Sequence, residues 1–192
     1  MTGVVLCGGQ STRMGADKGL LQKDATTWAK LAFNKLAALS IPVVVSVNQQ
    51  QQSTYSNFFN SPSLIIDEAN LNIGGPLHGI LSVHTQFPSS DLLVLACDMV
   101  AMETPVLRYL YDHSLTTNKD AIVFMNAAKA EPLCGIYKVA GLNKIKTLYA
   151  QGELKRHSMM YVLELLGADY LDVPGEWVGN FDNYNLPEQC SK

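Results

Sequence analysis

The sequence lacks both a cysteine framework and an excess of basic residues. Its four cysteines include no C-x-x-C pair. A chain of 192 residues can bury enough surface to fold without disulfides, so we expect no disulfide scaffold. Fourteen Lys and Arg residues against 17 Asp and Glu give a formal net charge of −3. Because nucleic-acid-binding proteins usually carry a basic excess, nucleic acid is not an expected partner, and any affinity for phosphate must be local.

Long apolar runs are also missing. No run approaches the ~18 residues that a membrane-spanning helix needs, and no basic stretch followed by an apolar one precedes the first predicted strand. We therefore expect a cytoplasmic protein with reduced thiols and no membrane partner. The sequence has neither an internal repeat nor a linker-like boundary, which predicts one domain spanning residues 1–192.

Apolar, β-branched runs alternate along the chain with segments of helical periodicity. Thr104 followed by Pro105 is typical of an N-cap and a first helical residue, whereas the glutamine-rich stretch 48–52 indicates a polar loop. The alternation predicts an α/β fold in three layers, with a Rossmann-like, mostly parallel sheet flanked by helices. The predicted strands are 2–7, 41–48, 63–67, 91–98, 121–126, 131–139 and 168–174, and the predicted helices are 26–40, 76–87, 105–115, 141–152 and 158–167.

Polar or glycine residues mark the ends of four of the predicted strands. Gly8 and Gly9 follow the first strand, and Asn48, Asp67 and Asp98 are the last residues of the second, third and fourth. In open α/β sheets, ligands bind outside the carboxyl ends of the strands. We therefore expect these four strand ends to form one crevice.

The segment after the first strand has the chemistry of an anion site. Its spacing fits neither the P-loop pattern G-x-x-x-x-G-K-[ST] nor the dinucleotide pattern G-x-G-x-x-G. Glycines nevertheless let backbone N–H groups approach an anion, and Arg13 and Lys18 add positive charge. The glycine pair by itself fits a tight turn equally well, but together with the two cations it predicts a phosphate site.

Two aspartates are candidate ligands. Asp98 suits Mg²⁺, which prefers one or two carboxylates plus phosphate oxygens, although an acidic residue after a strand can also cap a helix. Asp67 could serve the metal as well, accept hydrogen bonds from a sugar or base, or form a turn. The four histidines have no zinc-site spacing and are predicted not to be ligands. The basic stretch 152–158 is either a solvated face or a second anion site.

The segment LCGGQSTRMGADKGLL resembles the L-x-G-G-x-S-x-R-M-G-x-D-K signature of nucleotidyltransferases with a glycosyltransferase-A-like fold. Within that group, the chain is most similar to the molybdenum cofactor guanylyltransferases. The segments SVNQ, GGPLHGILSV, LACDMV, EPLCGIY and NYNLPE also occur in the family's order and cover nearly the whole chain. The chain departs from the family at Cys7, where alanine is usual, and at Leu186, where a hydroxyl residue is usual.

The resemblance implies that Arg13, Lys18 and Asp98 carry catalysis, with both cations on the triphosphate and Asp98 on Mg²⁺. It also implies three sets of contacts. These are GTP-binding residues at Leu6, Cys7, Gly8, Lys18, Asn48, Asp67 and Asp98, a base pocket at Gly75, Pro76, Leu77 and Gly79, and a cofactor or metal side at Asn183 and Asn185.

The reaction implied by the resemblance is Mg²⁺-dependent transfer of GMP from GTP to molybdenum-bound molybdopterin, with pyrophosphate as the second product. Proteins that deliver the molybdenum cofactor are the implied partners. The attacking phosphate oxygen of the pterin is already anionic near neutral pH, so positioning and charge stabilisation are sufficient without a general base. Three alternatives stay open: a molybdopterin cytidylyltransferase, a sugar-phosphate nucleotidyltransferase, and a non-catalytic nucleotide-binding regulator.

Overall fold

A seven-stranded sheet organises the computed structural model of the chain, which describes residues 1–8, 17–182 and 184. Six strands run in the same direction and β8 runs against them. This arrangement confirms the predicted mostly parallel sheet. The spatial order is β5 (Leu64–Ile66), β4 (Val43–Val47), β1 (Thr2–Leu6), β6 (Leu92–Ala96), β8 (Lys129–Tyr137), β7 (Ala121–Asn126) and β9 (Asp169–Asp172).

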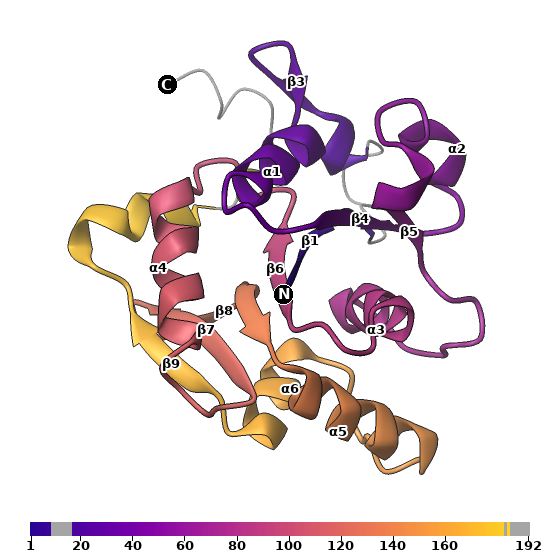
Figure 1. Ribbon diagram of the computed structural model, residues 1–192, viewed down its shortest axis with the longest axis vertical. Helices are drawn as coiled ribbons and strands as arrows, with labels where there is room; N and C mark the ends of the chain where they lie inside the picture. Colours follow the sequence, from indigo (N-terminus) through magenta and orange to yellow (C-terminus); the bar gives the residue numbers. More distant parts are fainter. Residues whose placement is uncertain (9–16, 183, 185–192) are drawn as a thin grey trace.

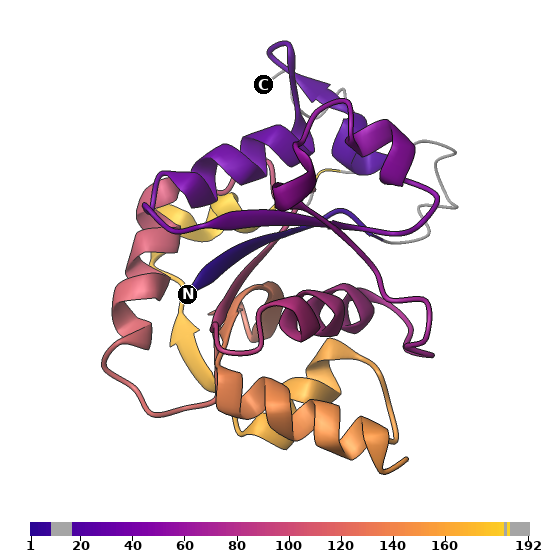
Figure 2. The same cartoon turned by 45° about the vertical axis from the view of Figure 1, so that its right-hand side comes forward.

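Helices cover both faces of the sheet, which confirms the three layers (Figure 1). One face is packed by α1 (Trp28–Ala37), α4 (Thr104–Ser114) and the short α2 (Gln52–Tyr55). The other face is packed by α3 (Pro76–Gln86), α5 (Val139–Ala150) and α6 (Met159–Leu166). Figure 2 shows α1 on one side of the strands, with α3 and α5 on the other. Within the described ranges, no helix is long and apolar enough to cross a membrane.

The pleat of the strands divides the core in two. On β1, Val4 and Leu6 face α3, whereas Val5 and Cys7, just beyond the strand, face α1. Each of these side chains is buried, and burying one Val or Leu contributes roughly 1.5–3 kcal/mol. Strands that are buried on both faces are expected in a parallel sheet covered by helices, and they explain the continuous apolar runs in the sequence.

Two local predictions were wrong. Thr104 is the first residue of α4, and the N-cap is Glu103, which makes no side-chain capping bond. The predicted loop at 48–52 ends inside α2. A helix of four residues has little stability by itself. Tertiary contacts hold α2, because Tyr55 is fully buried in the core on the α1 face and its hydroxyl donates to Asp17 Oδ1 at 2.9 Å.

Shorter elements complete the fold. A two-stranded ribbon is formed by β2 (Gln22–Lys23) and β3 (Thr26–Thr27). The 3₁₀ helices are η1 (Lys18–Leu20), η2 (Ser61–Ser63) and η3 (Gly175–Phe181). The β7–β8 connection is a two-residue turn in which Ala127 and Ala128 have φ of 45° and 65°, as the tightest hairpins require. β8 therefore begins two residues before its predicted start.

Candidate functional site

The strand ends singled out in the sequence lie at one edge of the sheet. Neighbouring strands β5, β4, β1 and β6 are parallel, so their carboxyl ends coincide. The ladder continues just beyond them, because Asp67 N–H donates to Val47 O at 2.8 Å and Cys97 N–H donates to Leu6 O at 3.2 Å. Asn48 and Asp67 follow β4 and β5 directly, and Gly8 and Asp98 lie two residues beyond β1 and β6.

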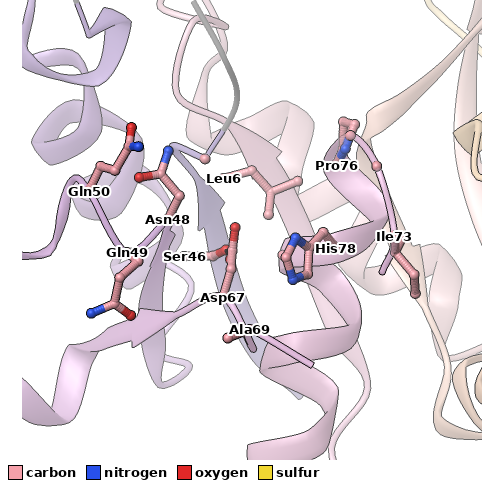
Figure 3. A pocket seen from close by; sticks show the side chains of 14 residues that line it. Leu6, Ser46, Asn48, Gln49, Gln50, Asp67, Ala69, Ile73, Pro76 and His78 are labelled. Atoms are coloured by element: carbon pink, nitrogen blue, oxygen red, sulfur yellow. Dashed lines mark hydrogen bonds between the residues drawn. The ribbon is translucent and has the colours of Figure 1, made fainter. Parts of the chain in front are cut away.

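A pocket of about 710 Å³ opens beside Asp67 between β1, β4 and the start of α3. Figure 3 shows Asp67 between Ser46 on β4 and His78 on α3, with Asn48 and Gln50 at the rim. The volume is in the range of small-molecule sites. The lining residues are Leu6, Gly8, Ser46, Asn48, Gln49, Gln50, Asp67, Ala69, Ile73, Gly74, Gly75, Pro76, His78 and Gly79.

Asp67 is a partly buried carboxylate with a fixed orientation. Ser46 Oγ donates to Asp67 Oδ1 at 2.9 Å. Burial raises the pKa of Asp67, and the hydrogen bond from Ser46 and the nearby His78 counteract part of that rise. The carboxylate therefore faces the pocket as a hydrogen-bond acceptor with one oxygen already paired.

Two glycines make room for this arrangement. A Cβ on Gly79 would lie 2.4 Å from Ser46 Oγ, and a Cβ on Gly8 would lie 3.1 Å from Asp67 Oδ2. The first distance is far below van der Waals contact, so a side chain on Gly79 would displace Ser46. Gly8 and Gly79 were both predicted site residues, and each allows a close approach of backbone to Asp67 or its partner.

Residues 68–75, which we call the strap, form the wall of the pocket opposite β4. The start of the strap is held by α3, because Glu68 N–H donates to Ser82 Oγ at 2.9 Å. His78 Nε2 lies 2.8 Å from the carbonyl oxygen of Glu68. A carbonyl only accepts, so this histidine nitrogen carries the proton.

The far end of the strap is held by residues from the second half of the chain. Asn72 N–H donates to the hydroxyl oxygen of Tyr149 on α5 at 2.8 Å. Gly74 N–H donates to Nδ1 of His157, in the α5–α6 connection, at 3.3 Å. The second bond brings His157, of the basic stretch 152–158, into contact with the strap. Arg156, the residue before His157, forms an ion pair with Glu164 on α6, with 3.5 Å between Nη2 and Oε2.

A second part of the site centres on Lys18, the first residue of η1. Its Nζ lies 3.0 Å from Asp98 Oδ2, and both side chains are about one-quarter exposed, at 24% and 22%. The ion pair therefore connects the segment after β1 to the end of β6. Arg13, the other predicted cation, lies outside the described residues.

Asp98 fits the role of a magnesium ligand. Among the residues that the structure describes, no group of three or more His, Cys, Asp or Glu side chains could enclose a metal. Asp98 offers a single accessible carboxylate next to a cation. Mg²⁺ accepts such a site, since it is commonly held by one or two carboxylates and by substrate phosphate oxygens.

The remaining predicted residues fall into three groups. Gly75 and Pro76 line the pocket with Gly79, whereas Leu77 is 1% exposed and packs in the core between α3 and the sheet. The Cys7 side chain is buried on the α1 face, away from the pocket face of Leu6. Asn183 and Asn185 lie outside the described residues.

Sequence reasoning missed several residues of the site. Ser46 could have been found, because it is a polar residue within the otherwise apolar strand VVVSV and is fully buried. Gln51 and Tyr55, which contact the segment before Lys18, carry no such signal. Gln51 is one of four consecutive glutamines. The contacts of Gln51 and Tyr55 become visible only in the three-dimensional structure.

The family described as MobA-like NTP transferase domain matches residues 3–164 of the chain. Among solved structures, the chain is similar to molybdopterin-guanine dinucleotide biosynthesis protein A from Archaeoglobus fulgidus. The TM-score is 0.77 and the identity 21%, with 99% of this chain and 95% of that chain covered.

The fold is shared with other nucleotidyltransferases. The 2-C-methyl-D-erythritol 4-phosphate cytidylyltransferase of Francisella tularensis matches with a TM-score of 0.69 at 11% identity, covering 98% of this chain and 96% of that chain. A putative glucose-1-phosphate thymidylyltransferase from Bacillus anthracis matches with a TM-score of 0.68 at 14% identity, covering 98% of each chain. These matches confirm the predicted nucleotidyltransferase fold.

Proposed function

The chain belongs to the MobA-like NTP transferase family, and from that premise we propose that it transfers GMP from GTP to molybdenum-bound molybdopterin and releases pyrophosphate. The observation that carries the proposal is the Lys18–Asp98 pair at the same edge of the sheet as the Asp67 pocket. The pair brings an ammonium and a carboxylate within 3.0 Å at the edge of the sheet, and the pocket of about 710 Å³ has room for a nucleoside. Triphosphate and nucleoside would therefore share one crevice.

The proposed chemistry requires little covalent participation from the protein. A terminal phosphate oxygen of the pterin forms a bond to the α-phosphorus of GTP, and the bond from that phosphorus to the β-phosphate oxygen breaks. The electron pair of the broken bond leaves with pyrophosphate. Since the attacking oxygen is already anionic, catalysis reduces to orienting the two phosphates and stabilising charge.

Lys18 is proposed to stabilise the leaving pyrophosphate. Its ammonium is already next to Asp98, so it is within reach of phosphates that share a metal with that carboxylate. Asp98 is proposed to hold Mg²⁺, which when bound neutralises phosphate charge at this position. We propose that Arg13 assists Lys18 on the triphosphate.

The nucleoside is proposed to occupy the Asp67 pocket. Asn48 and Asp67 offer an amide and a carboxylate at its mouth, and both would hydrogen-bond the sugar or the base. Gly75, Pro76 and Gly79 would form the apolar side against the base. Preference for guanine over other bases is supported by the likeness of the sequence motifs to those of guanylyltransferases.

The proposal is tested by titrating the protein with GTP, CTP, ATP and UTP in the presence of Mg²⁺, followed by an assay of pyrophosphate release with molybdopterin. We expect GTP to bind most tightly and pyrophosphate to appear only when the pterin is present. Preference for CTP would indicate the cytidylyl alternative. Release with a sugar phosphate would indicate the sugar-nucleotide alternative, and tight GTP binding without release would indicate a regulator.

Two substitutions test the assigned residues. Asp98→Asn and Lys18→Ala should each lower the rate of transfer by ~10²-fold or more, as removal of an electrostatic stabiliser typically does. Asp112→Asn and Lys119→Ala are matched controls, because both side chains are exposed near the ends of α4 and β7. Near-normal turnover by either site variant, with the thermal unfolding curve unchanged, would contradict the assignment.

A further inference from the structure

Gln51 joins three segments of the site through its own hydrogen bonds. Its Nε2 donates to the carbonyl oxygen of Cys7 at 3.0 Å and to Asp17 Oδ2 at 2.6 Å. Its Oε1 accepts from the backbone N–H of Asn48, and its own backbone N–H donates to Asn48 Oδ1, both at 3.0 Å. One residue therefore ties together the end of β1, the end of β4 and the residue that precedes Lys18.

Asp17 links Gln51 to Lys18. It is the N-cap of η1, the 3₁₀ helix that begins at Lys18, and its carboxylate accepts a hydrogen bond from Gly19 N–H at 3.0 Å. A capping residue fixes where a helix begins and how its first residues are oriented. The backbone position from which Lys18 reaches Asp98 therefore depends on where Asp17 is held.

Tyr55 holds Asp17 from the buried side. Its hydroxyl donates to Asp17 Oδ1 at 2.9 Å, and the side chain has no exposed surface. Burial raises the pKa of the Tyr55 hydroxyl well above its usual value, so the group stays protonated as a donor. A Cβ on Gly19 would lie 2.1 Å from this hydroxyl oxygen. The backbone of η1 is thus in direct contact with the Tyr55 hydroxyl, with no room for a side chain between them.

The neighbouring glutamines differ from Gln51. Gln49 Nε2 donates to Gln52 Oε1 at 3.1 Å on the surface, and Gln50 is exposed at the pocket rim. The chemistry at position 51 also requires an amide. A carboxylate there would face both the Asp17 carboxylate and the Cys7 carbonyl, and it has no proton to donate to either.

We propose that Gln51 is a positioning residue of the triphosphate site, which acts through Asp17 to hold Lys18 in place while it fixes the amide of Asn48. The inference rests on the proposed function only for the role of Lys18 in binding phosphate. Gln51 contributes no atom to the triphosphate. Gln51→Glu keeps both bonds to Asn48, because one uses a side-chain oxygen and the other the backbone N–H, and it removes only the donors to Cys7 and Asp17. The effect of that variant should therefore pass through Lys18 and matter only while Lys18 is present.

A double-mutant cycle tests this dependence. Affinity for the most tightly bound nucleoside triphosphate with Mg²⁺ is measured by calorimetry for Gln51→Glu, Lys18→Ala and the double variant. Gln51→Glu should weaken binding by ~10-fold or more, as loss of a hydrogen bond to a charged, partly buried group does. The double variant should bind within ~2-fold of Lys18→Ala, because residues that act through one another are not additive. Gln52→Glu is the matched control and should bind within ~2-fold of wild type.

Equal losses from Gln51→Glu in the presence and absence of Lys18 would overturn the proposal, and so would no loss at all. If thermal unfolding shows that Gln51→Glu does not fold, Tyr55→Phe replaces it in the same cycle. That variant removes one donor to Asp17 and keeps the buried ring, and the same non-additivity is required of it.

The cycle measures binding and not transfer, which separates the two proposals. A wild-type chain that binds a nucleoside triphosphate but transfers nothing to molybdopterin would overturn the proposed function and leave the cycle fully interpretable. A chain that binds none of the four triphosphates would overturn both.

Discussion

At the level of single residues, Asp67 shows how the surroundings of a carboxylate determine what it can bind. Burial raises its pKa, while the hydrogen bond from Ser46 and the nearby His78 lower it. The ionised form accepts hydrogen bonds from hydroxyl or amino groups, whereas the protonated form accepts less well and donates. The balance between burial and Ser46 therefore determines the lowest pH at which the pocket presents a full acceptor.

Removal of the Ser46 hydroxyl should shift this balance in a known direction. In Ser46→Ala, burial is no longer offset by the hydrogen bond, so the pKa of Asp67 should rise further. The acidic limb of the nucleotide-affinity profile should then move to higher pH, which calorimetry across roughly pH 4–8 would detect. Ser53→Ala, on the exposed side of α2, serves as the control. An unshifted limb would mean that ionised Asp67 is not what the nucleotide contacts.

The sequence was informative about some residues of the site and silent about others. Gly8, Asn48, Asp67 and Asp98 were predicted because each follows an apolar run, and parallel strands bring such positions to one edge. Gln51 could not be predicted, because its contacts depend on how a short helix packs against the end of β1. Tertiary contacts of this kind produce no periodic pattern of residues in the sequence.

At the level of elements, the strap is held from both sides. Its first residue bonds to α3, while Asn72 and Gly74 bond to Tyr149 and His157, which are distant in sequence. Ile73 and Gly74 line the pocket. Residues from the second half of the chain therefore hold in place a pocket wall that the first half of the chain forms.

Loosening the far end of the strap should therefore affect the base and not the phosphates. Tyr149→Phe and His157→Ala remove the two acceptors, so affinity for GTP should fall by ~3- to 10-fold, in line with the loss of a hydrogen bond. Discrimination between GTP and the other triphosphates should fall with it, while affinity for pyrophosphate stays unchanged. His113→Ala is the control, because His113 bonds to Asp169 on β9. A parallel fall in pyrophosphate affinity would contradict this reading of the strap.

Element prediction succeeded where periodicity was long. The helix containing Trp28 begins after the Thr27 cap, whose hydroxyl accepts from Lys30 N–H at 3.3 Å. It failed for α2, which is shorter than any reliable periodic window. The predicted start of α4 was also one residue late. Thr104-Pro105 looks like a cap followed by a first helical residue, but the N-cap is Glu103, which has extended backbone, and the helix begins at Thr104.

At the level of the whole molecule, Lys35 couples the stability of the fold to pH. On α1, its Nζ donates to the carbonyl oxygen of Val100 at 2.6 Å. Burial, with a smaller effect from the nearby Lys23, lowers the pKa of Lys35 to about 8, and Glu103 opposes the shift. The folded protein therefore releases this proton at a lower pH than the unfolded chain does.

The sign of the effect follows from proton counting. Between about pH 8 and the usual lysine value of 10.5, the unfolded chain binds more protons at this site than the folded chain, so stability rises with pH. Relative to Lys35→Met, the wild type should gain stability between pH 7.5 and pH 10, measured by urea unfolding at both values. The comparison cancels the other groups that titrate in this range. A difference that does not change with pH would contradict the shift.

The direction of β8 marks the limit of topology prediction. Continuous apolar strands separated by helices correctly predicted a mostly parallel sheet. The insertion of β8 between β6 and β7 was not predicted. The turn at Ala127 and Ala128 held a partial signal, because a two-residue connection forces its strands to be antiparallel.

The strand order also has a consequence for synthesis of the chain. Every described residue that lines the pocket lies before residue 80, but β6 pairs on one side with β1 and on the other with β8, which spans Lys129–Tyr137. A nascent chain that has emerged only to the end of β6 can assemble the pocket strands while β6 still presents an unpaired edge of five apolar residues. Such edges recruit other chains. Until some 40 further residues leave the ribosome, this edge therefore stays open to pairing with strands of other chains.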